Sequence, residues 1–354
     1  MIPFIKEFAF RDQVFFILSL TILVSLVLVF LFAISTIYLR LRNMRKAKRW
    51  RALEGKWEPI ILDYLDGERT VDDVRSQVGE KESLYFLDFT LRFAQRLRGE
   101  ENEAIDRLAE PYLSLLVKRS VKGDASQRAR ALRTLSTLGL DRFSDNIIAA
   151  LDDPSPLVAM IAARALMHED RPDYAEHVLA RLHRFENWSQ SYLASILTSV
   201  GVNITPALRN TLLDGNTPSR VRAITADALR ELYILEAADD AYQVIATEKD
   251  RDLLAAALRL LRAVGRPEHL PHIRNLCRSE DFVIRAQALH ALGSLGETED
   301  LALLEQGFAD ESPWVALQSA RGLKEAGGKS ILLQLISTKH PQSDLARQVL
   351  AEGG

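Results

Sequence analysis

The strongest constraint on the fold of this chain is an internal repeat of about 31 residues, a period that marks solenoids and repeat arrays. The positions that carry the period end apolar segments and are mostly glycine: Gly139, Asp170, Gly201, Tyr233, Gly265, Gly296 and Gly327. Four residues before each of them stands a leucine: Leu135, Leu166, Leu197, Leu229, Leu261, Leu292 and Leu323. These leucines are the predicted repeat core, because a solenoid buries the same position of every unit against its neighbours.

Each repeat is predicted to be two helices joined by a tight turn. In DFVIRAQALHALGSLG, residues 281–296, apolar residues recur at helical spacing and Gly296 ends the run. A glycine at this place is typical of a helix C-cap with a left-handed backbone. A second apolar run follows the turn, as at Ile273 and Leu276, and prolines such as Pro313 stand near expected helix starts. One such pair cannot bury its own apolar stripe, whereas stacked pairs can.

The units resemble HEAT repeats, in the compact form common in bacteria and shared with relatives of the phycobilin lyases. Residues 217–223 and 281–286 carry the pattern D-x-x-x-x-V-R-x-x-A-x-x-A-L-x-x-L-G best, and the resemblance covers residues 121–337. The first and third units depart from it at Gln127 and Ser189. The resemblance implies an all-α fold, a right-handed α-solenoid of about seven helix pairs with a concave protein-binding face. It implies no single activity, because fold and function are separable.

A long uncharged run near the N-terminus predicts a membrane anchor. Residues Val14–Leu39 contain no charged side chain. At about 1.5 Å per residue, a helix of this length crosses the roughly 30 Å hydrocarbon layer of a bilayer. The run is longer than the apolar part of a cleaved signal peptide, so that alternative is disfavoured. We expect one uncleaved transmembrane helix over residues 13–40, preceded by a short extracytoplasmic segment, residues 1–12.

A basic cluster directly after this run predicts its orientation. Its members are Arg40, Arg42, Arg45, Lys46, Lys48, Arg49 and Arg51. In the juxtamembrane segment, residues 41–57, Glu54 is the only acidic residue. The positive-inside rule places this side in the cytoplasm, so the N-terminus faces outward and the repeats are cytoplasmic, on the inner membrane if the chain is bacterial. The cluster also predicts contact with anionic lipid headgroups, at about 1 kcal/mol per basic residue. Tyr38, Trp50 and Trp57 are expected at the membrane interface.

Helical segments on both sides of the repeats are expected to cap them. Residues 58–120 carry apolar stripes at helical spacing and form a predicted collar, or N-terminal cap. Pro59 is expected to start its first helix, and Pro111 to kink or break its second. Residues 338–354 form the predicted C-terminal cap. Caps are needed because the terminal units of a solenoid would otherwise expose their apolar faces.

The residue types that most often carry chemistry form no recognisable catalytic or metal-binding set. Cys277 is the only cysteine, which excludes an intramolecular disulfide, and its apolar surroundings predict a buried structural thiol. His269 and His272 have a spacing that could bind a metal, but without a carboxylate beside them an ordinary surface turn is expected. Residues 327–330 end like a phosphate-binding loop and lack its upstream glycine. Irregular spacing predicts solvated surface for His168, His177 and His183.

These observations predict no catalytic, cofactor or metal site, and a membrane-tethered cytoplasmic scaffold that binds a protein partner through the solenoid surface. The partner is expected to be membrane-associated, for example an envelope machine such as a glycosyltransferase, because such anchored repeats often accompany one. The alternative is an enzyme of the bilin-lyase type, since those relatives share this kind of repeat. Nucleic-acid binding is not expected, because the net charge is −3 and no basic stripe recurs through the repeats.

Overall fold

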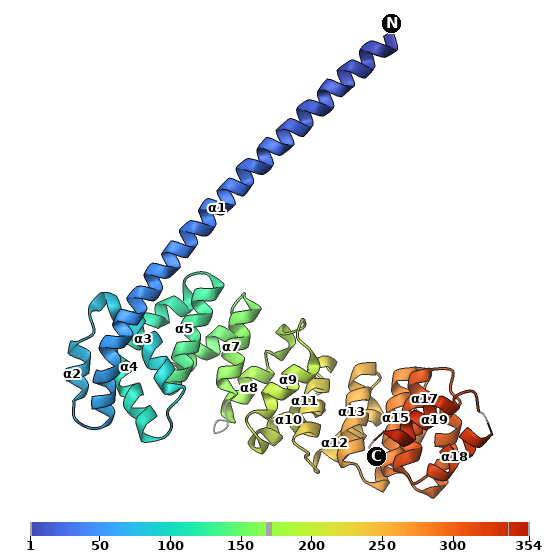
Figure 1. Cartoon of the computed structure of the whole chain (residues 1–354). Helices are drawn as coiled ribbons and strands as arrows, with labels where there is room; N and C mark the ends of the chain where they lie inside the picture. The colour runs from blue at the N-terminus through green and yellow to red at the C-terminus, as the bar shows by residue number, and fades with distance from the viewer. Residues whose placement is uncertain (1, 168–171, 339, 353–354) are drawn as a thin grey trace. The chain divides into compact units, whose positions relative to one another are not determined.

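The structure, a computed structural model, describes residues 2–167, 172–338 and 340–352, with the side chains of 2–17, 19, 140 and 141 left out. Within these ranges the regular elements are helices α1 to α19 with short 3₁₀ segments, and no strand is present (Figure 1). The predicted all-α fold is therefore confirmed. The chain divides into two compact units, Met1–Leu113 and Ser114–Gly354.

The first unit begins with α1 (Ile2–Leu65), one uninterrupted helix. The prediction that Pro59 starts a new helix is wrong, because Pro59 lies inside α1. A proline in a helix interior lacks the N–H that would bond to the carbonyl four residues earlier, and its ring crowds that carbonyl. On either side of it, Trp57 is 1% exposed and Ile61 is 0% exposed. The burial of these two side chains offsets the local cost of the proline.

Three further helices complete the first unit: α2 (Val71–Ser76), α3 (Ser83–Ala94) and the first half of α4 (Glu100–Val121). The ring of Trp57 packs on Phe86 and Phe89 of α3, with centroid distances of 5.3 and 5.8 Å. Trp57 is thus part of this core, and its expected place at a membrane interface is wrong. Helix α4 continues through Pro111, so the expected break there is wrong too.

The helices of the second unit follow one another in pairs (Figure 1). The first helices of the pairs are α5 (Ala125–Leu138), α7 (Pro156–Leu166), α9 (Gln190–Thr198), α11 (Ser219–Glu231), α13 (Arg251–Val264), α15 (Phe282–Leu295) and α17 (Pro313–Glu325). The second helices are α6 (Leu140–Ala149), α8 (Asp173–Leu179), α10 (Thr205–Leu213), α12 (Ala237–Thr247), α14 (Leu270–Leu276), α16 (Leu301–Phe308) and α18 (Lys329–Ser337), and α19 (Ser343–Ala351) follows. Helix α5 packs on α7, and α9, α11, α13, α15 and α17 pack on one another in succession. The predicted solenoid of stacked pairs is confirmed.

The predicted repeat leucines all lie in the interior. Each is 0% exposed: Leu135, Leu166, Leu197, Leu229, Leu261, Leu292 and Leu323. Fully burying a leucine side chain stabilises a fold by about 1.5–3 kcal/mol, so these positions account for much of the packing between pairs.

The turn positions between paired helices do not share one backbone conformation. Three are left-handed: Gly201 (φ 81°), Tyr233 (φ 56°) and Gly327 (φ 83°). Gly265 and Gly296, with φ of −67° and −68°, are not. At both of the latter a Cβ would lie 2.4 Å from the carbonyl oxygen four residues earlier. Glycine is needed there for close approach, and the predicted left-handed cap holds only for part of the repeats. Asp170 lies outside the described residues.

The two first helices α15 and α17 touch through their backbones. A Cβ on Gly293 would lie 2.1 Å from the Cα of Gly322, and both glycines are buried. Small residues permit this approach, and a side chain at either position would push the two helices apart.

Candidate functional site

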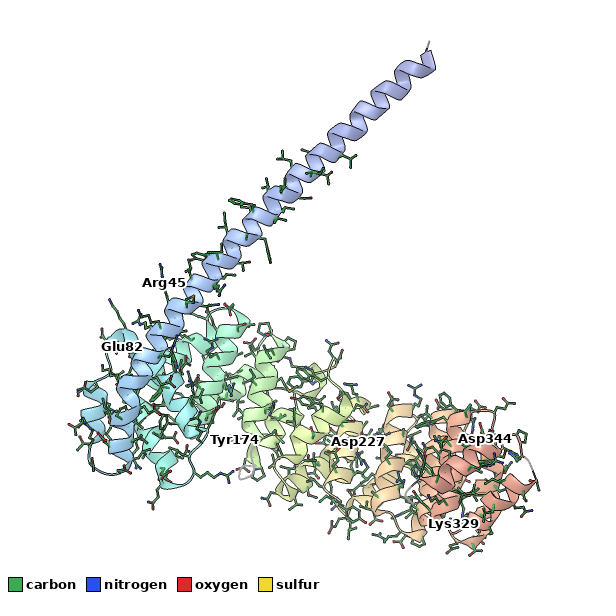
Figure 2. The ribbon with its side chains drawn as sticks, viewed as in Figure 1. Arg45, Glu82, Tyr174, Asp227, Lys329 and Asp344 are labelled. Carbon is green, nitrogen blue, oxygen red and sulfur yellow. The ribbon has the colours of Figure 1, made fainter. Side chains whose placement is uncertain are left out.

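The predicted basic cluster lies on the exposed surface of α1. Every member is exposed: Arg40, Arg42, Arg45, Lys46, Lys48, Arg49 and Arg51. None of these side chains forms an ion pair or donates a hydrogen bond to another described residue. The acidic residue of the same segment, Glu54, forms an ion pair with Arg92 of α3. The Nη1 atom of Arg92 lies 3.4 Å from the Oε1 atom of Glu54. The ion pair described for Glu54 therefore involves Arg92 and not a member of the cluster. Figure 2 marks Arg45 on the part of α1 that extends beyond the neighbouring helices of its unit.

Directly before the basic cluster, residues 20–39 of α1 present a mainly apolar exposed surface. The described part of the helix includes an apolar window with a mean hydropathy of 2.8, none of it buried. It is long and apolar enough to cross a membrane. Helices α9 and α10 are long and apolar enough to cross a membrane only if they are taken together, and the pair is bent by 103°. Their apolar residues Leu193, Leu197 and Leu208 are buried in the stack, which identifies that pair as core.

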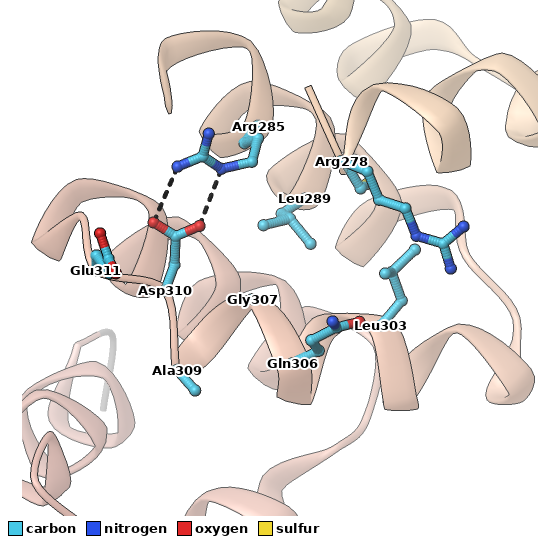
Figure 3. Close-up of a pocket in the computed structure, with 10 residues that line it drawn as sticks. Arg278, Arg285, Leu289, Leu303, Gln306, Gly307, Ala309, Asp310 and Glu311 are labelled. Carbon is cyan, nitrogen blue, oxygen red and sulfur yellow. Dashed lines mark hydrogen bonds and ion pairs between the residues drawn. The ribbon is translucent and has the colours of Figure 1, made fainter. Parts of the chain in front are cut away.

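A cavity of about 510 Å³ opens between α14, α15 and α16 (Figure 3). Leu289 and Leu303 line it, and Cys277 lies at its edge. Cys277 is 6% exposed, which confirms the predicted burial, and burial raises the pKa of its thiol to about 12. A thiol with this pKa stays protonated near neutral pH and is a poor nucleophile. The cavity therefore has a mixed apolar and polar lining, and its thiol is not activated.

Arginines at one position of the repeat connect consecutive pairs of helices. At the rim of the cavity, Arg285 forms a two-pronged ion pair with Asp310, at 2.9 and 3.1 Å (Figure 3). Arg128 does the same with Asp153, at 2.8 Å for both contacts. The Arg128 guanidinium holds the pKa of the Asp153 carboxyl below its ordinary value. These arginines stand where the repeat pattern has its V-R arginine, and their ion pairs are structural bonds between neighbouring units.

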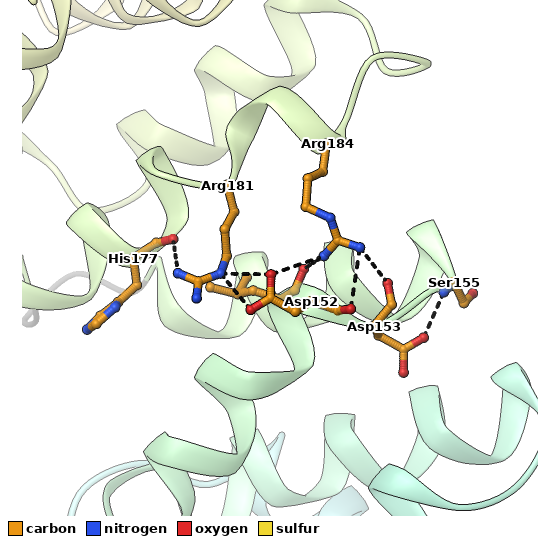
Figure 4. A network of polar contacts seen from close by, with 7 residues as sticks. Asp152, Asp153, Ser155, His177, Arg181 and Arg184 are labelled. Atoms are coloured by element: carbon orange, nitrogen blue, oxygen red, sulfur yellow. Dashed lines mark hydrogen bonds and ion pairs between the residues drawn. The ribbon is translucent and has the colours of Figure 1, made fainter. Parts of the chain in front are cut away.

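A second polar network joins the loop after α6 to the short helix after α8 (Figure 4). Arg181 Nε lies 2.9 Å from Asp152 Oδ2, and Arg184 donates to the carbonyl oxygen of Asp153 at 3.1 Å. Arg184 also donates to the carbonyl of Leu151. Arg184 thus satisfies carbonyls at the end of a helical segment, and Arg181 neutralises the Asp152 carboxylate, so both arginines already have partners within the chain.

The histidines differ from expectation at one place. His177 and His183 are exposed, as predicted, and His168 lies outside the described residues. His269 is 1% exposed, so the predicted surface turn is wrong for this residue. Its Nε2 lies 3.0 Å from Asp239 Oδ1, and its Nδ1 accepts the backbone N–H of Arg266 at 3.0 Å. The carboxylate comes from the preceding repeat, 30 residues away, where no local spacing could reveal it.

Asp239, Glu268 and His269 come close enough to one another to hold a cation. That position is already filled by the guanidinium of Arg266, which lies 2.8 Å from Asp239 and 2.6 Å from Glu268. Since Nδ1 of His269 accepts a hydrogen bond, Nε2 carries the proton of the neutral ring and donates to Asp239. The group is an ion-pair network between repeats, and its bonds to His269 and Arg266 lower the pKa of Asp239.

A row of exposed apolar side chains was not predicted. Leu157, Phe282 and Trp314 are exposed in the first turns of α7, α15 and α17. Trp188, just before α9, is half-buried and stacks on Tyr192 with a centroid distance of 5.2 Å. We call Leu157, Trp188, Phe282 and Trp314 the first-turn ridge. They stand 13 or 14 residues before the turn position of their repeats, whereas the fourth and fifth repeats have Arg220 and Asp252 there. That recurrence is the sequence signal that could have revealed them.

Comparison with known proteins identifies the repeats. Residues 238–324, from α12 to α17, match the family model for HEAT repeats. The predicted resemblance to HEAT repeats is supported for this segment. No curated protein matches the chain.

Among solved structures, the chain is similar to the karyopherin Kap121p bound to the extreme C-terminus of the protein phosphatase Cdc14p. That similarity has a TM-score of 0.45 and 13% identity, over 77% of this chain and 38% of the karyopherin. A mutant of Kap121p gives a TM-score of 0.42 and 13% identity, over 76% and 35% of the two chains. The chain thus spans less than two fifths of the length of these structures.

Proposed function

We propose that the protein is a membrane-tethered scaffold that binds a protein partner through its helical stack. The order of surfaces along α1 supports the tether most, because exposed apolar residues such as Phe30 are followed directly by the exposed basic cluster. Exposed apolar surface of this extent is costly in water and favourable in a bilayer.

The basic cluster supports an orientation as well as a tether. By the positive-inside rule, the cluster and the stack lie in the cytoplasm and the N-terminus lies outside. The seven side chains also attract anionic lipid headgroups. Because all seven side chains are exposed, their charge can reach the membrane surface.

The first-turn ridge supports the binding function of the stack. Aromatic residues such as Trp314 and Phe282 are enriched among the anchors of protein interfaces, where a large rigid ring is buried at low entropic cost. A partner already at the membrane, such as an envelope glycosyltransferase, would gain affinity from the tether through a raised effective concentration.

An enzyme of the bilin-lyase type gains no support from the described side chains. The one thiol, Cys277, is buried with a pKa raised to about 12. The buried histidines His269 and His290 are paired with carboxylates that tie repeats together. These groups fit structural roles, and we propose that the chain is not an enzyme.

The ridge can be tested against a matched exposed residue. Affinity capture of the full-length protein in mild detergent, followed by mass spectrometry, identifies the partner. Phe282→Asp with Trp314→Asp should then reduce capture by at least tenfold, because both rings would be replaced by charges. Leu333→Asp changes an equally exposed apolar residue on α18 and should leave capture unchanged. Equal loss in both variants, or no loss in either, would remove the ridge from the proposal.

A further inference from the structure

A cavity of about 400 Å³ lies in the first unit, between α1 and the start of α3. Four members of the basic cluster line it: Arg42, Arg45, Lys46 and Arg49. Two tyrosines, Tyr38 of α1 and Tyr85 of α3, line it as well. The cavity thus combines four cations with two phenol hydroxyls.

Helix geometry sorts the basic cluster into two faces. At 3.6 residues per turn, residues three, four and seven apart share a face, which places Arg42, Arg45, Lys46 and Arg49 together. Arg40 and Arg51 fall on the opposite face and Lys48 on the flank. Only four cations of the cluster therefore line the cavity. The other three cations lie in the same segment and serve as a control for the effect of charge alone.

The packing of α3 on α1 gives the cavity its second wall. The ring of Tyr85 lies against Trp50, with centroids 6.0 Å apart. The guanidinium of Arg49 sits over the Tyr85 ring, 5.2 Å from its centroid. Arg92 stacks on the other aromatic residue, Trp50, at 4.1 Å. A cation–π contact of this kind holds Arg49 beside the cavity and restricts its rotamers.

The ion pairs described for the first unit do not include the four cations of the cavity. Two acids of the same unit pair with other cations, Glu54 with Arg92 at 3.4 Å and Glu82 with Lys56 at 3.9 Å. Like charges three and four residues apart on a helix repel one another. An anion in the cavity would relieve this repulsion, and a phosphate group fits best because its oxygens accept several hydrogen bonds from arginine, lysine and tyrosine at once.

We propose that this cavity is a binding site for one phosphate group, that of an anionic lipid headgroup in the cytoplasmic leaflet. The assignment rests on the proposed tether and deepens it. Tyr38 stands at the end of the uncharged run Val14–Leu39. If this run spans the bilayer, the cavity begins at the depth of the lipid headgroups. A site of this kind binds one lipid in a fixed place, whereas diffuse attraction would involve all seven cations equally.

The test compares two triple variants of the full-length protein in nanodiscs of phosphatidylcholine with 10–20% phosphatidylglycerol, on the order of a physiological anionic fraction. The cavity variant is Arg42→Gln, Arg45→Gln and Lys46→Gln. The control, Arg40→Gln, Lys48→Gln and Arg51→Gln, removes the same charge from the same segment. Native mass spectrometry counts the phosphatidylglycerol molecules retained after detergent release. We expect one retained lipid in the wild type and the control, and at least tenfold lower occupancy in the cavity variant and in Tyr85→Ala.

Equal loss of lipid in both triple variants overturns the site and leaves only diffuse attraction, while the tether stands. Displacement of the retained lipid by millimolar inorganic phosphate overturns the headgroup assignment in favour of a soluble phosphate. Failure of the proposed tether is a separate result, because the wild-type protein would then not enter nanodiscs at all.

Discussion

The apolar part of α1 and the first helices of the stack are both rich in large aliphatic residues, and their surroundings are opposite. Phe30 on α1 is 68% exposed, whereas Leu292 on α15 is 0% exposed. The stack supplies each first helix with a neighbouring helix at the same repeat position, but no described helix covers residues 20–44 of α1. The contrast shows that an apolar helix needs a partner of matching surface, which is another repeat in one region and, we propose, the bilayer in the other.

The largest effect that separates the two regions is expected when charges are introduced into the apolar surface of each. Leu292→Asp places an unpaired carboxylate between α15 and its neighbours and should destabilise the stack by several kcal/mol, on the order of 3–5. Leu26→Asp with Phe30→Asp changes exposed residues and should leave the stack intact, while it impairs membrane insertion. Thermal melting in detergent and membrane pelleting measure the two outcomes.

Glu305→Ala is the surface control for this pair, because Glu305 is exposed on α16 and makes no ion pair. It should change the melting temperature by little. If Leu292→Asp melts like this control, the assigned register of the repeat is wrong.

The two units should also respond to acid in opposite directions. Asp106 of the first unit has a buried Oδ1 without a hydrogen-bond partner, and burial raises the pKa of its carboxyl from 3.8 to about 6. Its folded form therefore favours the proton, and this group stabilises the unit below pH 3.8 and loses that contribution as pH rises through 6. Asp106→Asn should stabilise the chain at pH 7 by up to about 3 kcal/mol, the equivalent of 2.2 pKa units. As the pH is lowered from 7 to 4, the melting temperature of the wild type should rise relative to that of the variant.

Glu325 of the second unit shows the opposite sign. Its hydrogen bonds from His290 and Ser294 lower the pKa of the carboxyl from 4.5 to about 2. The stabilisation is present above pH 4.5 and is lost as pH falls toward 2. Glu325→Gln should flatten the acid limb of the melting profile without the gain at pH 7 seen for Asp106→Asn. A common pH profile for both variants would contradict the assigned environments.

Glycine-to-alanine substitutions compare the two regions through a smaller expected change in stability, because only one methyl group is added. Gly293→Ala places a Cβ 2.1 Å from the Cα of Gly322, so α15 and α17 must separate. The expected cost is about 1–3 kcal/mol, the range of an overpacked core. Chemical denaturation measures it, and a neutral result would mean that the two helices do not touch through their backbones.

Gly55→Ala tests the same chemical change on α1. No heavy atom lies within 4 Å of the added Cβ, and the residue is exposed. Alanine should stabilise this helix by about 0.5–1 kcal/mol, because glycine loses more backbone entropy on folding. A loss of stability there would show that the helix is interrupted near Pro59.

Local periodicity made the repeat, its paired helices and the positions of leucines such as Leu292 predictable from the sequence. Contacts between distant segments were not predictable in this way. The pairing of His269 with Asp239 joins successive repeats, and the wall that Tyr85 adds beside Arg49 depends on how α3 crosses α1. Pro59 was misread because the burial of its neighbours outweighs its local preference, which only the packed structure reveals.

The most direct test of the tethered scaffold is the sidedness of its two ends in intact cells. Cys277 is buried with a pKa raised to about 12, so an introduced cysteine is the only one that a maleimide labels readily. With a membrane-impermeant maleimide, Ile2→Cys should be labelled in intact cells, and Glu305→Cys on the stack only after permeabilisation. Labelling of Glu305→Cys in intact cells, or a protein that fails to pellet with membranes, would contradict the account.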